Sequence, residues 1–382
     1  MSRTARIFSN ITNLDYLQSA RSFKYKNLDL QHLAEQVKTG RFKFSPLQMA
    51  KVPKTNNRYR IICMPSDKDK FVQQVLLKNL SSKEEDVFHV HSDISFGGPN
   101  KGVAKAIKMA LTYMKKYPYY LKIDIVSFFD EIDRNLLIKK INKLKLVAPI
   151  KRLLIQVVNC ELKFRSKEDK QIAEQEGIKR GRGVRQGMPL SPYLSDLALK
   201  DFDIKLCKLK RIKAIRYCDD MLIFGKSERV LKEIISKIKN WLKDENLQIH
   251  MTGKKKPVIA KSNEKTEFLG YMLKKGRAYV SKESKNNIKI NIRNYLDWRK
   301  LKNKNVDMNL YDFVKKLKAI KIGYINAYSE ASNKKHLNEL IDKNIKMVFC
   351  SVLTDILGED SMNKIVTDKD KMRFLGVNGL NF

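Results

Sequence analysis

The spacing of hydrophobic positions predicts helices and strands in alternation along the first part of the chain. Residues 28–40 have the pattern of a short helix closed by Gly40, and residues 67–82 and 102–117 again show helical spacing. Residues 50–63 are predicted to form a strand, a turn at Lys-Thr-Asn-Asn-Arg, and a second strand. Both element types therefore contribute to the fold.

The middle of the chain continues this mixture. Tyr119 to Ile125 is rich in strand-forming residues, and helical spacing begins at Asp130. Residues 165–176 are highly charged and are expected to form an exposed excursion. A loop then leads into a helix that Ser191 is expected to cap, with Pro192 in its first turn.

Residues 212–225, IKAIRYCDDMLIFG, are predicted to be two strands joined by a tight turn. An amphipathic helix is expected over 227–243, and a second strand pair over 267–280 with its turn around 274–277. From about residue 285 the pattern is mostly helical and rich in lysine. We interpret this change of composition as a domain boundary.

Two adjacent aspartates, Asp219 and Asp220, lie inside the apolar hairpin. A surface turn is the ordinary explanation, because Asp is common in turns. The alternative is a metal site, because pairing of two strands in one sheet can bring Asp219 beside Asp124 at the end of another strand. Carboxylate oxygens suit Mg²⁺, and two such ions can hold the attacking and leaving oxygens of a phosphoryl transfer.

Net charge narrows the choice of partner. The 382 residues contain 78 Lys+Arg against 41 Asp+Glu, a formal net charge of +37. Folding does not require this excess, whereas a nucleic acid gains affinity from it through counterion release. A lysine-rich proteome is the alternative explanation. An anionic membrane is the weaker rival, because no single basic amphipathic helix dominates.

Other compositional features exclude some classes. The five cysteines are scattered, odd in number and without a Cys-x-x-Cys pair, which argues against a disulfide framework and a zinc site. No apolar run approaches the roughly 20 residues that span a bilayer, and the first residues have no signal-peptide core. We therefore expect a cytoplasmic protein with no membrane partner.

Five segments, in this order, resemble the motif series of reverse transcriptases: FGGPNKG, KIDIVSFFDEID, RQGMPLSP, RYCDDMLIFG and EFLGY. The most specific is Tyr-x-Asp-Asp, here Tyr217 to Asp220. The resemblance spans roughly residues 50–280. It implies an α+β fold of right-hand polymerase architecture and the activity of an RNA-directed DNA polymerase, a nucleotidyltransferase.

The resemblance also implies a division into fingers, palm and thumb. Fingers are expected at 1–118 and 149–183. The palm, with its antiparallel sheet, is expected at 119–148 and 184–284. A basic helical thumb that contacts phosphate and sugar is expected at 285–382.

Site residues are carried over from the family by position. Asp124, Asp219 and Asp220 match its catalytic, metal-binding aspartates, which implies two Mg²⁺ ions with Mn²⁺ as a substitute. Asp220 is expected to contribute less directly, with support of the turn as its alternative role. Phe129 matches the aromatic gate that excludes a 2′-hydroxyl, and Gln186 matches the residue that touches the incoming nucleotide.

The neighbours of these residues have plainer roles. Phe128 is expected in the core, while Arg185 is a candidate for added positive charge at the nucleotide. Gly187 and Pro189 are expected to shape the loop, and Cys218 is expected to be a small packing residue rather than a nucleophile.

Basic residues complete the predicted site. Lys54, Arg58 and Arg60 are candidates for triphosphate binding, with a solvated basic hairpin as the alternative. Lys254, Lys255 and Lys256 lie where the family often has a lysine near the active site, and the sequence does not distinguish among them. Gly270 matches the primer-grip region, where a strand backbone approaches closely.

The wording GVRQGMPLSPYLSDLAL is similar to the bacterial group II intron-like branch. No RNase H domain, maturase extension or Cys-rich endonuclease is recognisable, so a stand-alone enzyme of antiviral defence is expected. Its partners would be a structured non-coding template RNA, a DNA primer or product, and dNTPs. An intron-type mobile-element protein and a catalytically silent RNA-binding polymerase fold remain alternatives. Oligomeric state is open.

Overall fold

The computed structural model of the chain describes residues 3–21, 25, 27–53, 58–81, 94–98, 101–274, 276–296 and 310–360. They form two compact units. The first comprises residues 1–102 and 117–261, and the second comprises 103–116 and 262–382. None of the helices in these segments combines the length and the hydropathy that a membrane-spanning helix requires.

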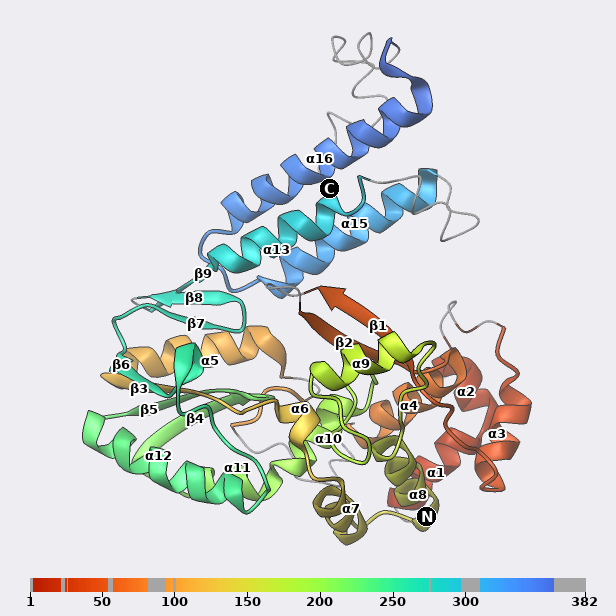
Figure 1. The fold of residues 1–382 in the computed structure, drawn as a ribbon, viewed down its shortest axis with the longest axis horizontal. Coiled ribbons are helices and arrows are strands. Elements are labelled where there is room, and N and C mark those ends of the chain that lie inside the picture. The colour runs from red at the N-terminus through yellow and green to blue at the C-terminus, as the bar shows by residue number, and fades with distance from the viewer. Residues whose placement is uncertain are drawn as a thin grey trace. The chain divides into compact units, whose positions relative to one another are not determined.

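The first unit holds most of the secondary structure (Figure 1). Before residue 102 its elements are α1 (Arg3–Thr12), α2 (Leu14–Ala20), α3 (Leu30–Lys38), β1 (Gln48–Pro53), β2 (Tyr59–Met64) and α4 (Asp67–Leu80). After residue 117 they are β3 (Tyr119–Asp124), α6 (Phe128–Glu131), α7 (Arg134–Lys143), α8 (Ala148–Val158), α9 (Lys167–Gln175), α10 (Ser191–Ala198), α11 (Lys200–Cys207), β4 (Ile212–Tyr217), β5 (Asp220–Gly225), α12 (Glu228–Lys243), the 3₁₀ turn η3 (Gly253–Lys255) and β6 (Val258–Lys261).

A four-stranded antiparallel sheet organises this unit, in the order β4-β5-β3-β6. β5 lies between its hairpin partner β4 and the distant strand β3, and all but the first of its residues are buried. Buried on both faces, such a strand reads as a continuous apolar run rather than an alternating one. The register of β3 and β5 places Asp124 directly opposite Asp220.

Helix α12 packs against the sheet, contacting β3, β5 and β6 (Figure 1). Ser227 begins it, because its side chain accepts a hydrogen bond from the backbone N–H of Val230. Its buried residues, Leu231, Ile234, Ile238 and Leu242, recur on one face. Each buried side chain of this kind contributes about 1.5–3 kcal/mol, so this helix stabilises the strands that carry the aspartates.

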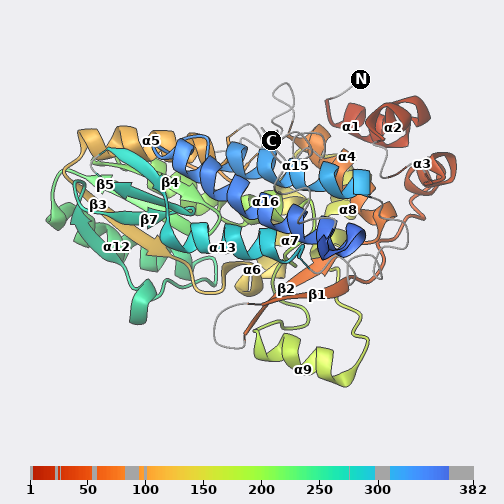
Figure 2. The same ribbon diagram turned by 90° about the horizontal axis from the view of Figure 1, so that it is seen from above.

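The second unit contains α5 (Gly102–Lys116), whose first residue is counted with the other unit, and a three-stranded antiparallel sheet. Its strands are β7 (Thr266–Phe268), β8 (Tyr271–Lys274) and β9 (Arg277–Val280). Three helices follow and lie side by side (Figure 2): α13 (Lys282–Arg293), α15 (Leu310–Ala327) and α16 (Lys334–Leu357). Mixed helices and antiparallel sheets confirm the α+β fold class.

One local prediction is wrong, and two others are confirmed with added detail. Ser191 does not cap α10: it is the first helical residue, and its hydroxyl donates to the carbonyl of Arg185 instead. The charged stretch 165–176 is exposed but forms the helix α9, which Ser166 caps. The strand pair over 267–280 has a third member, β7, because the two-residue turn at Leu269 and Gly270 opens a further hairpin.

Candidate active site

A two-residue turn places Asp219 at the end of the sheet where β4 connects to β5. Tyr217 of β4 pairs with Asp220 of β5, which leaves Cys218 and Asp219 as the loop. Cys218 has a φ of +54°, as the first loop residue of a tight hairpin requires. Burial raises the pKa of the Cys218 thiol to about 12, so it stays protonated and serves as a packing group.

Asp124 ends the neighbouring strand at the same place. It lies opposite Asp220 in the register, and the backbone N–H of Ile125 donates to the carbonyl of Asp219 over 3.4 Å. Like charges directly opposite each other across a sheet are destabilising. As predicted, Asp124 therefore lies beside Asp219 and Asp220. Together they concentrate negative charge that a bound cation would neutralise.

Neighbouring charges act on both Asp219 and Asp124. Burial raises the pKa of the Asp219 carboxyl; a hydrogen bond from its own backbone N–H opposes this, and Asp124 raises it further. Lys255 and Arg60 lower it. The Lys255 ammonium lies 2.9 Å from Asp124 Oδ2, and His250 Nε2 lies 3.4 Å from Asp124 Oδ1.

The donor set fits Mg²⁺. Asp124 Oδ1 is buried and accepts no hydrogen bond, and a lysine ammonium already neutralises the other oxygen of that carboxylate. Among the residues that the structure describes, no three acidic, histidine or cysteine side chains enclose an ion by themselves. Mg²⁺ does not require such a cage, because it completes its shell with water and substrate phosphate.

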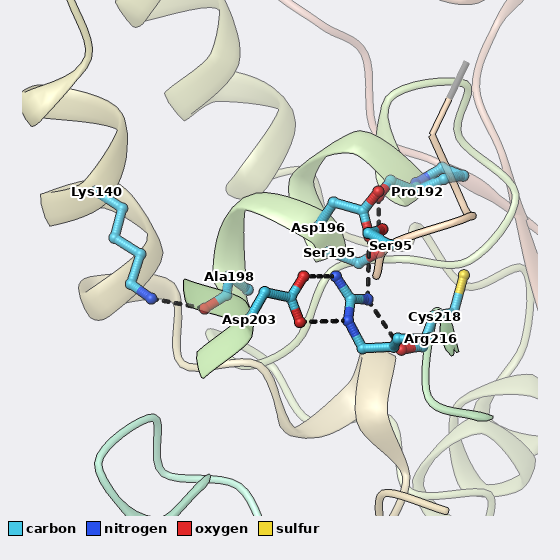
Figure 3. A network of polar contacts seen from close by, with 9 residues as sticks. All are labelled: Ser95, Lys140, Pro192, Ser195, Asp196, Ala198, Asp203, Arg216 and Cys218. Carbon is cyan, nitrogen blue, oxygen red and sulfur yellow. Dashed lines mark hydrogen bonds and ion pairs between the residues drawn. The ribbon is translucent and has the colours of Figure 1, made fainter. Parts of the chain in front are cut away.

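A buried guanidinium holds the turn from behind (Figure 3). Arg216 has no exposed side-chain surface; it donates to Asp203 in a fork, with Nε to Oδ1 at 2.8 Å, and its Nη1 lies 3.0 Å from Asp196 Oδ1. The same Nη1 donates to the carbonyl of Cys218 over 3.1 Å. Burial lowers the pKa of Arg216, but the two carboxylates outweigh it and raise the pKa, so the guanidinium stays charged.

The segment around Ser95 completes this cluster. The N–H of Arg216 donates to the carbonyl of Ile94, and the N–H of Phe96 donates to the carbonyl of Arg216, each over 2.7 Å. The Ser95 hydroxyl donates to Asp196 Oδ1 at 2.9 Å. The outer edge of β4 is thus covered at the residue that anchors the turn.

The loop after residue 182 positions two predicted nucleotide contacts. The N–H of Val184 donates to the carbonyl of Phe129, and the N–H of Cys63 in β2 donates to the carbonyl of Gln186, each over 2.7 Å. Gly187 has a φ of +109°, and a Cβ there would lie 2.6 Å from the Cys63 carbonyl oxygen. Only glycine allows this approach, so the loop joins α6 to β2.

Two neighbours of these residues belong to the core. Phe128 is buried, as predicted, while Phe129 is only partly covered. Arg185, expected to add charge at the nucleotide, is buried and has an ion pair with Glu161 at 2.7 Å. Arg134 binds the other oxygen of Glu161 at the same distance. The loop preceding Gln186 is therefore fixed by an internal charge cluster, and Arg185 has a structural role.

The predicted basic residues lie in different surroundings. Arg60 is exposed on β2 and close enough to Asp219 to lower its pKa, whereas exposed Arg58 forms an ion pair with Glu176 at 3.0 Å. Lys54 lies outside the described residues, and the side chain of Lys254 is likewise not described.

Of the remaining lysines, Lys255 contacts Asp124, and Lys256 is exposed. Gly270 belongs to the second unit, in the turn between β7 and β8, with a φ of +80°. A Cβ there would lie 2.9 Å from Ser284 Oγ. The close approach expected at Gly270 therefore occurs within its own unit.

Two features of the site were missed at the level of sequence. His250 gave no signal beyond being a lone histidine next to a charged run. Arg216 did give one, because a charge in the middle of the apolar strand IKAIRY requires a buried partner. Asp196, Asp201 and Asp203 are the carboxylates of the preceding helical segment, and the structure pairs Arg216 with Asp196 and Asp203.

Comparison with known proteins gives the family. The family model described as "Reverse transcriptase (RNA-dependent DNA polymerase)" matches residues 52–273, more than half of the chain. The chain belongs to the reverse transcriptase family. Its antiparallel sheet and helices are those of the right-hand polymerase fold that the resemblance implied. Asp124, Phe129, Gln186 and Asp219 all lie inside the matched region.

Similar proteins include a COX1/OXI3 intron 2 protein of Saccharomyces cerevisiae, 26% identical over 64% of this chain and 34% of the relative. The retron Ec83 reverse transcriptase of Escherichia coli is 28% identical over 47% of this chain and 52% of its own length. The chain thus spans about half or less of these relatives. Apo telomerase from Candida tropicalis aligns over 88% of this chain and 62% of its own, with 15% identity and a TM-score of 0.44, a score too low to support the fold assignment.

Replacing Arg216 tests the anchor of this reverse transcriptase turn. Arg216→Met leaves Asp196 and Asp203 buried without their cation, so we expect a loss of about 3–5 kcal/mol in the free energy of unfolding, measured with urea. The control is Lys205→Met, which removes an exposed ion pair with Asp244 and should cost about 0–1 kcal/mol. Equal losses in the two variants would contradict the anchoring role.

Proposed function

We propose that this protein is an RNA-templated DNA polymerase that adds deoxynucleotides to the 3′ end of a primer. The observation that carries the proposal is the meeting of Asp124 and Asp219 at one edge of the sheet, with Asp220 opposite Asp124. Family membership supports the same activity. A catalytically silent RNA-binding fold is disfavoured. Carboxylates that repel one another across the sheet destabilise the first unit, and such a cluster suits a cation site better than a surface that only contacts RNA.

Each residue has a proposed task. Asp124 and Asp219 hold divalent cations, and Asp220 supports them from the strand opposite. Bound Mg²⁺ would neutralise charge on the attacking and leaving oxygens of phosphoryl transfer. Arg60, exposed near Asp219, is the best placed of the basic candidates to bind the triphosphate.

Two further residues select the nucleotide. The partly exposed ring of Phe129 is proposed to exclude the 2′-hydroxyl of a ribonucleotide. Gln186 is proposed to contact the nucleotide from the loop whose Val184 N–H donates to the carbonyl of Phe129. The side chain of Lys255 is 60% exposed. When a cation replaces the Lys255 ammonium at Asp124, this exposed side chain is proposed to move toward a phosphate.

The proposed template is a structured non-coding RNA copied by an enzyme of bacterial antiviral defence. Similarity to a retron reverse transcriptase favours this template class. The intron-type alternative is favoured by the longer match to the yeast intron protein. Sequencing the nucleic acid that copurifies with the protein separates them: a dedicated small RNA with its cDNA supports the first, and spliced intron RNA supports the second.

Primer extension tests the activity directly. With Mg²⁺, dNTPs and a DNA primer annealed to an RNA template, the wild-type protein should synthesise DNA. Asp219→Asn should lose at least about a thousandfold of that rate, because it removes charge at the centre of phosphoryl transfer. RNA binding of this variant should stay within about twofold of wild type.

Asp244→Asn is the matched control, because it removes the same charge from an exposed position of the same unit. It should keep wild-type synthesis. If Asp219→Asn synthesises DNA as fast as this control, the metal role of Asp219 is wrong. If the wild-type protein makes no DNA on any template, its copurifying RNA included, the silent-fold alternative replaces the proposal.

The Phe129 gate makes a separate prediction. Phe129→Ala opens space beside the sugar, so the preference for dNTP over rNTP should fall at least about tenfold, measured as the ratio of the two kcat/KM values. Phe128→Leu is the control, since Phe128 is buried beside it with ring centroids 5.4 Å apart. An unchanged ratio in Phe129→Ala would assign that ring to packing.

A further inference from the structure

A groove in the first unit lies apart from the candidate active site: its lining includes none of the three aspartates Asp124, Asp219 and Asp220, and neither Arg60 nor Gln186. It has a volume of about 980 Å³. Its walls are the segment 43–46, helix α8 with Asn142 of α7, and the segment 159–163. The size suits a few nucleotides or another ligand of that scale.

The walls are joined by their backbones, so the groove is preformed. The N–H of Leu47 donates to the carbonyl of Glu161 at 2.8 Å, and the N–H of Lys163 donates to the carbonyl of Leu47 at 2.9 Å. Across the groove, Gln156 of α8 accepts from the N–H of Phe44 and donates to the carbonyl of Phe42, each over 3.3 Å. A site fixed in this way loses little entropy on binding.

The lining combines cations with an apolar floor. Lys43, Lys151, Arg152 and Lys163 supply positive charge around apolar surface that includes Phe44. The single carboxylate in the lining, Glu161, is already neutralised by Arg134 and Arg185 at 2.7 Å each. The net charge of the groove is therefore strongly positive, which selects an anionic ligand.

We propose that this groove binds an unpaired segment of RNA, with a base stacked on Phe44 and phosphates on the surrounding cations. An aromatic ring among basic residues is the arrangement with which proteins hold single-stranded nucleic acid. Stacking requires a base that is not paired in a duplex. The choice of RNA over other polyanions rests on the proposed function.

The position of the groove gives this binding a use. Glu161 lines it and also fixes Arg185, the residue before Gln186. RNA held there lies against the same charge cluster that fixes the loop before Gln186. The groove thereby retains the partner RNA while the aspartates act on a different part of it.

Fluorescence anisotropy with a short labelled single-stranded oligouridylate tests the proposal on the full chain, without dNTPs. Lys43→Gln with Lys163→Gln should weaken binding about tenfold and reduce the slope of log affinity against log salt by about 1.4, for two lost phosphate contacts. Phe44→Leu should weaken binding about fivefold with an unchanged slope, because stacking releases no counterions.

The matched control is Lys237→Gln with Lys239→Gln, which removes two exposed charges from α12 of the same unit. Binding by the groove variants equal to that of this control would overturn the proposal. As a second measurement on the wild-type protein, a photocrosslinking oligonucleotide with thiouridine should attach within 43–46 or 148–163. Crosslinks found only in other segments would also overturn it.

Primer extension by the wild-type protein separates this proposal from the proposed function. DNA synthesis together with control-like binding by the groove variants rejects the groove alone. Loss of binding in the groove variants without any synthesis by the wild type rejects the polymerase activity and leaves an RNA-binding groove.

Discussion

The position of Asp219 depends on the ion pair between Arg216 and two buried aspartates. A two-residue turn at the end of two strands has few contacts of its own, and its first residue has a positive φ. Arg216 compensates by reaching from β4 to the carbonyl of Cys218 while Asp203 and Asp196 hold its guanidinium. Removing one partner of such a buried cluster costs about 3–5 kcal/mol, so the turn is fixed by the same charges that link the sheet to α10 and α11.

A second charge cluster fixes the loop that carries Gln186. Glu161 binds Arg134 and Arg185, and the chain then turns through Gly187 against β2. Buried arginines thus position the loops of this unit. Exposed Arg60 instead adds positive charge near the aspartates. The surplus of positive charge in the sequence conceals this division, because both kinds of arginine count equally in composition.

Much of the site follows from sequence because its signals are local. The helix 227–243 has a periodic apolar face, whereas the hairpin 212–225 and the strand ending at Asp124 are short runs of strand-forming residues, and the structure confirms all three. Partnerships across the fold are not local. No residue near Arg185 in the sequence indicates that it pairs with Glu161. The sequence therefore could not distinguish a buried, structural Arg185 from one that contacts the nucleotide. In the sequence Ser191 resembles a helix cap, but in the structure its hydroxyl donates to the carbonyl of Arg185 instead.

Asp124 and Asp219 are proposed to hold a divalent cation together. The most direct measurement is anomalous X-ray diffraction from crystals of the protein with an RNA template, a DNA primer, a non-reactive dNTP analogue and Mn²⁺. We expect anomalous density between the two carboxylates, with Lys255 displaced from Asp124. Mn²⁺ bound elsewhere, with the Lys255–Asp124 ion pair intact, would contradict it.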